Sequence, residues 1–475
     1  MIAKDISNSD SGRIDAVLLS LYLALVGIGW LMIYAVGYKQ GYTEDFNEFM
    51  LKTVVGKQSI FIGISLLLIL IIFSIDAKFW RVFAYPIYGV GLILLVLVLF
   101  FGKEINGAKA WFSFGVFGFQ PAEVAKLGTC LVLSNFLSSP STSLRDSQAT
   151  LTILGLLGLP MCLIILQPDA GSMLVFLSFS IMMYREGMSG TPYLIAFSVL
   201  TVFIIALLFE QSPNEVVMYL MMVSSLIFAF NIADRQRIWL TATISLIITS
   251  AYLFFNNQQD IALFLMLICV LLYIVVHSRR GRFRMVIVTA GALLLSSIVV
   301  YSTSFAFKNV LKKHQQDRID VWLRPDKVDP HGAAYNLNNS KLAIGSGGLQ
   351  GKGYLEGTLT KLNFVPEQQT DFIFCTIGEE QGFVGVFAVI AIFVLFLIRI
   401  VQVAERQKLN FARLYGYGLA GIFFFHFFIN IGMTMGLVPV IGIPLPFVSG
   451  GGSSLLGFTA MLAILLKLDS SRYTI

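Results

Sequence analysis

The feature of this sequence that most constrains its fold is a succession of apolar segments, each long enough to cross a lipid bilayer as a helix. A bilayer core about 30 Å thick needs about 20 apolar residues at 1.5 Å of rise per residue. Such segments recur along nearly the whole chain of 475 residues, and only 13% of its residues are charged. This pattern excludes a soluble globular protein and predicts an all-α, polytopic integral membrane protein whose residues 1–475 form a single membrane domain.

About fourteen spans are expected. Their boundaries lie near residues 16–37, 58–75, 82–101, 121–138, 149–166, 171–185, 193–209, 215–232, 238–256, 260–277, 285–305, 381–403, 411–434 and 449–467. The segment before the first span is polar, and that span is too long for the core of a signal peptide, so we expect no cleaved signal.

Basic residues predict the orientation of the chain. If the N-terminus is cytoplasmic, the short outer loops contain only Lys39, Lys52, Lys57, Lys103 and Lys109, whereas the inner loops contain roughly eighteen Lys and Arg residues. This asymmetry also explains the net charge of +6, so no nucleic-acid partner is expected. The orientation places a large extracytoplasmic loop, residues 306–379, on the outer face.

The longest polar passage of the chain, residues 315–385, begins in this loop, so we expect the chemistry there. A second unusual segment, residues 437–454, is apolar but interrupted by three prolines and a run of glycines. Proline removes a backbone donor and blocks regular helix, so this segment should be irregular and re-entrant.

Glu123 and Lys126 are spaced i, i+3 in the span that follows Gln120-Pro121, so they share one helix face. Charged groups inside a span face each other or a cavity. Two interpretations remain open: a structural ion pair, or the polar floor of a substrate cavity. In the turn Gln167-Pro168-Asp169, the aspartate is expected to cap the helix that follows.

The glycine-rich stretch from Gly345 to Gly353 resembles a phosphate cradle but lacks Walker spacing. It could present backbone N–H groups and Lys352 to a pyrophosphate, or act as a flexible hinge. Asp329, in the dipeptide Asp329-Pro330, could be a general base or part of an ordinary turn. The four cysteines and four histidines show no metal-binding spacing, so a histidine-built metal site is not expected.

Several of these motifs occur in an order that resembles the SEDS family (shape, elongation, division and sporulation) over most of the chain. They are Gln120-Pro121-Ala122-Glu123 with Lys126, Gln167-Pro168-Asp169, Asp329-Pro330 followed by Tyr335 and Ser340, the glycine-rich stretch, Pro366-Glu367, Thr370-Asp371, Glu379-Glu380, and Pro444-Leu445-Pro446-Phe447 with Gly451-Gly452-Ser453. Within the family, the sequence around Gly345–Gly353 and Phe364–Glu367 is more similar to the elongation branch than to the division branch.

The resemblance implies a SEDS-like helical bundle and a peptidoglycan glycosyltransferase. Such an enzyme polymerises lipid II, an undecaprenyl-linked disaccharide peptide, at the outer face of the bacterial cytoplasmic membrane. Its implied partner is a class B penicillin-binding protein, a transpeptidase that crosslinks the strands. The resemblance assigns the essential carboxylate to Asp329, the general base in our hypothesis. The substrate-binding residues that we predict around it are Glu123, Lys126, Tyr335, Ser340, Lys352, Thr370 and Asp371.

Lys126, Lys352 or a divalent cation (Mg²⁺ or Mn²⁺) would hold the pyrophosphate leaving group.

The sequence departs from the family pattern in three places. Gly107-Ala108-Lys109-Ala110-Trp111 lacks the usual arginine, and Ser449-Gly450-Gly451-Gly452-Ser453 lacks the usual tyrosine. The chain also has about four spans more than the ten typical of the family, and we place these inserted helices at residues 193–277. An even number of added spans keeps the later loops on the same side of the membrane.

Three other functions remain open: a lipid II flippase or other transporter, a division-type polymerase, and a non-catalytic scaffold for the crosslinking enzyme. A transporter would favour repeated halves with helices broken at corresponding positions. No such repeat is apparent in the sequence, which favours the polymerase.

Overall fold

The fold is known from a computed structural model, which describes residues 14–38, 49–50, 52–105, 107–114, 117–140, 142, 144, 146–233, 237–255, 258–279, 283–329, 332 and 334–473. Helices occur at all fourteen apolar segments. They are α2 (Ala16–Gly37), α4 (Val54–Ser74), α6 (Ala84–Phe101), α7 (Pro121–Leu137), α8 (Ser147–Ile165), α9 (Ala170–Val175) continued through a 3-10 turn (Phe176–Ser178) into α10 (Phe179–Arg185), α11 (Thr191–Leu208), α12 (Pro213–Ala233), α13 (Arg237–Phe255), α14 (Gln259–Arg279), α15 (Phe283–Asn309), α19 (Ile373–Glu405), α20 (Asn410–Met435) and α21 (Gly452–Ser470).

Ten helices in the described part of the chain are long and apolar enough to cross a membrane. Three further apolar stretches, in α9–α10, α12 and α13, are shorter. The predicted class, an all-α polytopic membrane protein, is therefore confirmed.

The remaining elements are short. They are α5 (Ala77–Val82), α16 (Lys313–Leu323), a 3-10 turn (Pro325–Lys327), α17 (Tyr335–Ser346), α18 (Thr358–Lys361), and the strands β1 (Lys103–Ile105), β2 (Ala108–Phe114) and β3 (Phe117–Phe119). The strands form a small antiparallel sheet in the order β1-β2-β3. We did not expect this sheet from the sequence, because its strands are too short to give a clear alternating pattern.

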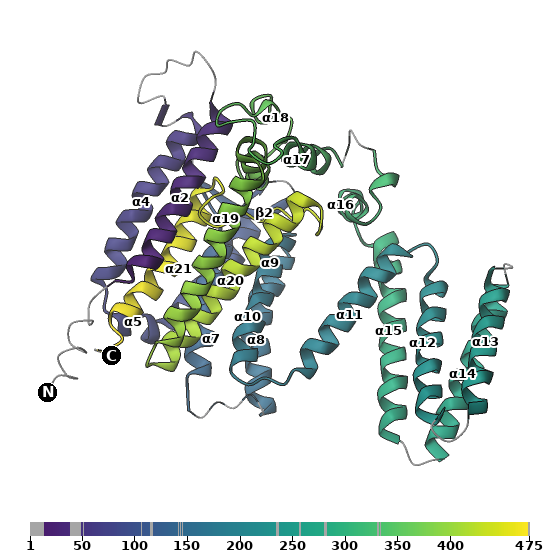
Figure 1. The fold of residues 1–475 in the computed structure, drawn as a ribbon. Coiled ribbons are helices and arrows are strands. Elements are labelled where there is room, and N and C mark those ends of the chain that lie inside the picture. Colours follow the sequence, from purple (N-terminus) through teal and green to yellow (C-terminus); the bar gives the residue numbers. More distant parts are fainter. Residues whose placement is uncertain are drawn as a thin grey trace. The chain divides into compact units, whose positions relative to one another are not determined.

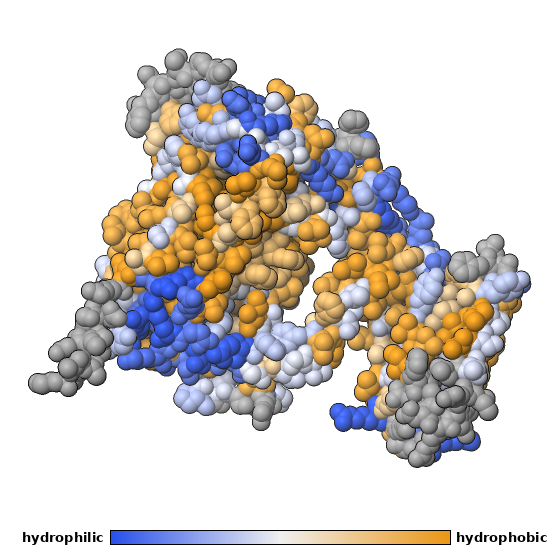
Figure 2. Space-filling view, viewed as in Figure 1, coloured by the Kyte–Doolittle hydropathy of each residue, from blue (hydrophilic) through white to orange (hydrophobic). Residues whose placement is uncertain are grey.

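The chain divides into two compact units, residues 1–188 with 329–475, and residues 189–328. In the first unit, α6 packs on α7, α4 on α21, and α19 on both α2 and α20. Phe447 lies at the centre of this core, with the rings of Tyr22, Phe396, Phe423 and Phe458 around it at centroid distances of 5.0–6.0 Å. Figure 2 shows an apolar belt on this unit between two hydrophilic ends, as expected of a bundle that crosses a bilayer.

The second unit contains α11 to α16. In it α12, α13 and α14 pack on one another, and α15 packs on α11, α12 and α14 (Figure 1). Arg324, just after α16, contacts Glu210 with a nitrogen–oxygen distance of 2.9 Å and also pairs with Asp320. This ion pair attaches the segment after α16 to the connection between α11 and α12. Four of the helices, α11 to α14, fall on the segments that we expected to be inserted.

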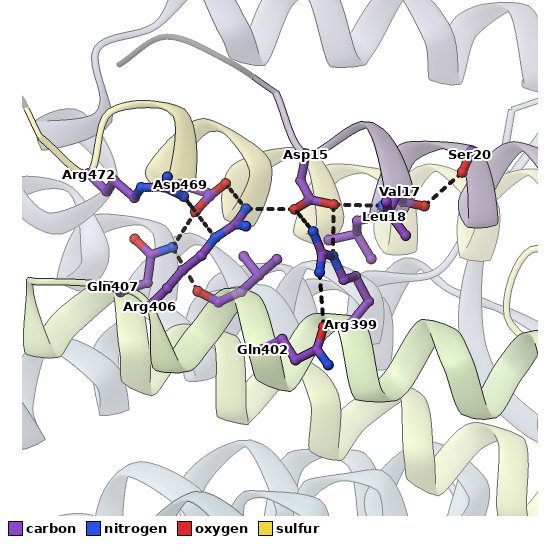
Figure 3. Close-up of polar contacts among 11 residues, drawn as sticks. Asp15, Val17, Leu18, Ser20, Arg399, Gln402, Arg406, Gln407, Asp469 and Arg472 are labelled. Carbon is purple, nitrogen blue, oxygen red and sulfur yellow. Dashed lines mark hydrogen bonds and ion pairs between the residues drawn. The ribbon is translucent and has the colours of Figure 1, made fainter. Parts of the chain in front are cut away.

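A polar network closes the end of the first unit that holds the N-terminus of α2 (Figure 3). The Asp15 carboxylate caps α2 by accepting from the Leu18 amide at 2.8 Å. It also accepts from Arg399 at 3.1 and 2.8 Å and from Arg406 at 2.7 Å. Arg406 also donates to Asp469 of α21 at 2.8 Å. The buried carboxylates of Asp15 and Asp469 therefore join the ends of α2, α19 and α21.

The charge of Asp15 is stabilised by these contacts. Burial alone would raise the pKa of the Asp15 carboxyl, but the hydrogen bonds from Arg399, the Leu18 amide and Arg406 outweigh burial and hold that pKa below its ordinary value. A carboxyl whose pKa is lowered in the folded state stabilises that state at pH values above its unfolded pKa. This contribution is lost as the pH falls through the lowered pKa.

We therefore expect Asp15→Asn to lower the free energy of unfolding by about 2 kcal/mol at pH 7, because an amide can cap the helix but cannot pair with two arginines. Asp76→Asn is the matched control: Asp76 also caps a helix, α5, and accepts from the Lys78 amide at 2.8 Å. Thermal unfolding in detergent at pH 7 and at about pH 3 measures both variants. The difference between them should shrink at the lower pH; equal losses at pH 7 would contradict the role of the ion pairs.

Candidate active site

Helix α19 is broken near its start, and the glycine-rich stretch fills the break. Gly382 has φ and ψ of 62° and −161°, which interrupts the helical hydrogen bonds. The Glu379 and Glu380 carbonyls accept instead from the amides of Lys352 and Gly353, each at 3.0 Å. The Phe383 and Val384 amides in turn donate to the carbonyls of Gly348 and Leu349, at 2.9 and 3.1 Å. The stretch is therefore held in place by backbone pairing.

The glycines are needed because two backbones approach closely here. A Cβ atom at Gly347 would lie 1.9 Å from the Gly378 carbonyl oxygen, and one at Gly351 would lie 2.1 Å from that of Glu380. Gly351 also has a φ of +80°, which favours glycine. The amides of Gly351, Lys352 and Gly353 all donate within the protein. These three amides are therefore engaged within the protein, and of the groups predicted here to contact a pyrophosphate, the Lys352 side chain is the candidate that is left.

The Lys352 ammonium lies 2.7 Å from a carboxylate oxygen of Glu379 and 2.8 Å from the Thr358 hydroxyl. Glu379 is fully buried and also accepts from the Leu359 and Thr360 amides, each at 2.9 Å. One carboxylate thus orients the lysine and holds α18. We predicted no role for Glu379 from the sequence, although a glutamate beside an apolar span was a signal for one.

Residues 436–451 are irregular, which confirms most of the irregular segment predicted at residues 437–454; its last three residues instead begin helix α21. Polar side chains bond several backbone groups of the segment. Asn430 donates to the Ile443 carbonyl at 2.7 Å and to the Asp371 carbonyl at 2.9 Å. The Ser449 hydroxyl accepts from the Leu445 amide at 2.8 Å and donates to the Thr370 carbonyl at 2.6 Å. The predicted residues Thr370 and Asp371 therefore lie against this segment, joined to it through their backbone.

Glu123 and Lys126 form a buried ion pair with a nitrogen–oxygen distance of 2.9 Å, and their side chains are only 4% and 1% exposed. Lys126 also lies 3.0 Å from Nε2 of His426, whose Nδ1 is 3.1 Å from the Pro444 carbonyl oxygen. A carbonyl can only accept, so Nδ1 carries the proton and Nε2 of a neutral imidazole accepts from the ammonium. His426 thereby links Lys126 to the irregular segment.

His426 was not predicted from the sequence, because its partners lie far away in the chain. A lone histidine inside an apolar span was the available signal. Asp169 was predicted correctly as the cap of α9: it accepts from the Ser172 amide at 3.0 Å. The Gln120 side chain also donates to Asp169 at 3.0 Å, which joins the start of α7 to that of α9.

The other predicted residues lie on or before α17. Asp329 is exposed in a turn where its carbonyl accepts from the Gly332 amide at 3.1 Å; Pro330 lies outside the described residues. Tyr335 is the first residue of α17. Ser340 is fully buried and donates to the Thr434 carbonyl at 3.0 Å, so it contributes to the packing of α17 on α20.

Among the residues that the structure describes, no group of three or more His, Cys, Asp or Glu side chains could hold a metal ion.

These features define a class of protein: a polytopic helical membrane protein with a broken helix, an irregular segment and a buried charged cluster at its centre. A family model described as "Cell cycle protein" (FTSW_RODA_SPOVE) matches residues 16–219 and 207–474. The chain belongs to this family.

Named relatives match along most of their length. The chain is 33% identical to the peptidoglycan glycosyltransferase RodA of Treponema pallidum, over 94% of this chain and 95% of the relative. It is 27% identical to the peptidoglycan glycosyltransferase MrdB of Escherichia coli K12, over 98% and 95% of the two chains. It is 28% identical to a probable peptidoglycan glycosyltransferase FtsW of Idiomarina loihiensis, over 96% and 87%.

Solved structures share the fold. A chain from a study of how a peptidoglycan synthase complex coordinates polymerization and crosslinking aligns with a TM-score of 0.62 and 24% identity, over 98% of this chain and 99% of that one. The rod shape determining protein RodA of Thermus thermophilus aligns with a TM-score of 0.55 and 23% identity, over 97% and 98%.

The close approach at the break in α19 predicts that Gly351→Ala will destabilise the protein by about 2 kcal/mol or more, since the new Cβ meets backbone and the residue has a positive φ. Gly345→Ala is the matched control. Gly345 lies in helix α17 with open space at its Cβ position, so this change should stabilise the protein by up to about 1 kcal/mol. Unfolding in detergent measures both variants; equal effects would show that the close approach does not matter.

The buried ion pair predicts a coupling between Glu123 and Lys126. Glu123→Gln should lower the free energy of unfolding by about 3–5 kcal/mol, because it leaves the ammonium without its counter-charge. Adding Lys126→Met should restore part of this loss, because the double variant buries no charge. A double-mutant cycle in detergent micelles measures the coupling. Additive losses would contradict the pairing.

Proposed function

We propose that this protein is a peptidoglycan glycosyltransferase that polymerises lipid II into glycan strands, in the elongation branch of its family. The observation that carries this proposal is the match, over nearly the full length of both chains, to relatives named peptidoglycan glycosyltransferase RodA and MrdB. The exposed carboxylate of Asp329, in the polar loop before α17, is the group that we assign to the chemistry.

In the proposed reaction, the 4-hydroxyl of the acceptor sugar attacks the anomeric carbon of the growing chain, which is linked to undecaprenyl pyrophosphate. The new glycosidic bond forms with inversion as the bond to the pyrophosphate breaks. The hydroxyl proton passes to Asp329, which acts as the general base. Pyrophosphate leaves as an anion, so it needs a nearby positive charge more than it needs an acid.

Lys352 and Lys126 are the two candidates for that charge. Lys126 is almost fully buried between Glu123 and His426, so it could reach a substrate only after a rearrangement. Lys352 is 27% exposed in its side chain and is oriented by Glu379. We therefore assign the pyrophosphate contact to Lys352, and to Lys126 the positioning of the irregular segment through His426.

We also propose that a divalent cation, Mg²⁺ or Mn²⁺, accompanies the substrate. The described residues hold no cluster of three or more suitable side chains, so the ion would be bound mainly by pyrophosphate oxygens and water, as Mg²⁺ commonly is.

We also propose the membrane orientation of the enzyme and its protein partner. The distribution of basic residues supports a cytoplasmic N-terminus and an outward-facing loop at residues 306–379. The similarity to a chain of a peptidoglycan synthase complex supports a class B penicillin-binding protein as the partner.

A division role is the second candidate, because FtsW proteins are also similar over most of the chain. Depletion in cells distinguishes the two roles: an elongation enzyme is needed for rod shape, and a division enzyme is needed for septum formation.

The base assignment predicts that Asp329→Asn will reduce lipid II polymerisation by at least about 100-fold, because the amide keeps the shape but cannot accept the proton. Asp326→Asn is the matched control, an exposed aspartate three residues earlier, and should retain wild-type activity. The assay is the length of glycan strands formed by the purified protein with its transpeptidase partner. Wild-type activity of Asp329→Asn would disprove the base, and a wild-type protein that moves lipid II without polymerising it would favour a flippase.

A further inference from the structure

A cavity of about 500 Å³ lies at the end of the first unit where α5 connects two spans. Its polar lining comes from Lys78 and Arg81 of α5 and from Asn135 near the end of α7. Its apolar lining includes Val82, Leu409 and Leu468. The proposed reaction uses none of these residues.

The two cations of this cavity differ from several arginines of the first unit, which form ion pairs with carboxylates. Arg185 pairs with Glu405, Arg399 with Asp15, and Arg406 with both Asp15 and Asp469. In the described part of the chain, neither Lys78 nor Arg81 has a carboxylate within ion-pair distance, and both are exposed.

The carboxylate nearest in sequence to this pair belongs to Asp76, which is engaged in capping α5 through the Lys78 amide. Lys78 and Arg81 are three residues apart on one helix, so their side chains lie on the same face. Two positive charges thus face one cavity, and no carboxylate among the described residues forms an ion pair with either of them.

The cavity lies near the ends of several helices that are candidate membrane spans. Helix α5 occupies the short connection between α4, which ends at Ser74, and α6, which begins at Ala84. Both neighbours are candidate membrane spans. Asn135 and Leu468 are likewise close to the ends of α7 and α21. The cavity therefore opens where the hydrocarbon core meets the headgroup layer. Figure 2 shows hydrophilic side chains gathered at this end of the unit, beside the apolar belt.

We propose that this cavity binds the headgroup of an anionic glycerophospholipid. Lys78 and Arg81 contact the phosphate oxygens, and the glycerol and first acyl carbons lie against Val82, Leu409 and Leu468. Charge-assisted hydrogen bonds to phosphate suit a guanidinium and an ammonium, and basic pockets between spans favour acidic lipids. The apolar lining favours a lipid over free phosphate, because an inorganic ion would leave that surface in contact with water.

Trp80 of α5 gives a local readout, since it lies between the two cations in sequence and is 7% exposed. The full-length protein in detergent micelles is titrated with brominated phosphatidylglycerol, which quenches nearby tryptophans. The contribution of Trp80 is the fluorescence of the wild-type protein minus the fluorescence of its Trp80→Phe variant at each lipid concentration. We expect saturable quenching by phosphatidylglycerol and much weaker quenching by brominated phosphatidylcholine.

The double variant Lys78→Gln/Arg81→Gln should bind phosphatidylglycerol at least tenfold more weakly, since each cation near an anionic headgroup contributes about fivefold. Lys103→Gln/Lys361→Gln, which removes two exposed lysines elsewhere, should change the affinity less than twofold. Thermal unfolding of both variants checks that they fold.

Three results would overturn the proposal. They are equal quenching of Trp80 in the wild-type protein by brominated phosphatidylglycerol and brominated phosphatidylcholine, an unchanged affinity for phosphatidylglycerol in a folded double variant, or displacement of the lipid by millimolar inorganic phosphate. Loss of transpeptidase binding in the double variant, with lipid quenching unchanged, would also overturn it and would identify a protein interface instead.

Discussion

The interior of a bilayer offers no water to a peptide group, and this constraint governs the centre of the structure. Residues 436–451 are irregular and α19 is broken at Gly382, so both expose backbone groups that a regular helix would satisfy. Asn430 and Ser449 supply the hydrogen bonds for the first, and the glycine-rich stretch supplies them for the second. Both irregular regions therefore have backbone groups that bond to other parts of the protein.

The same constraint explains how charges are placed. Inside the bundle, Glu123 neutralises Lys126, and neutral His426 accepts a further hydrogen bond from the ammonium. At the end of the bundle, Asp15 and Asp469 each pair with arginines that are partly exposed. Removing one member of such a pair costs more than the pair contributes, because the remaining charge stays buried. Lys78 and Arg81 are exposed, so they do not need a counter-charge from the protein and can contact a ligand.

Much of the fold and part of the site could be predicted from sequence because the relevant signals are local. Apolar runs of span length do not depend on what they pack against, and all fourteen became helices. The spacing of Glu123 and Lys126 places them together on any helix, and Asp169 caps the helix that follows it. We predicted a role for Lys352 because glycines surround it in the sequence. In the structure those glycines allow the backbone to approach α19 closely. A local sequence pattern cannot distinguish this close approach from a phosphate cradle.

The sequence by itself determined the membrane class, the position of the apolar helices, most of the irregular segment predicted at residues 437–454 and the family resemblance, because each depends on residues that are neighbours in the chain. Only the tertiary structure decided that His426 lies against Lys126, that Glu379 holds Lys352, and that Asn430 joins Asp371 to Ile443. These contacts connect residues far apart in sequence. Their physical reason is the need of each buried charge and peptide group for a partner, which any nearby element of the bundle can supply.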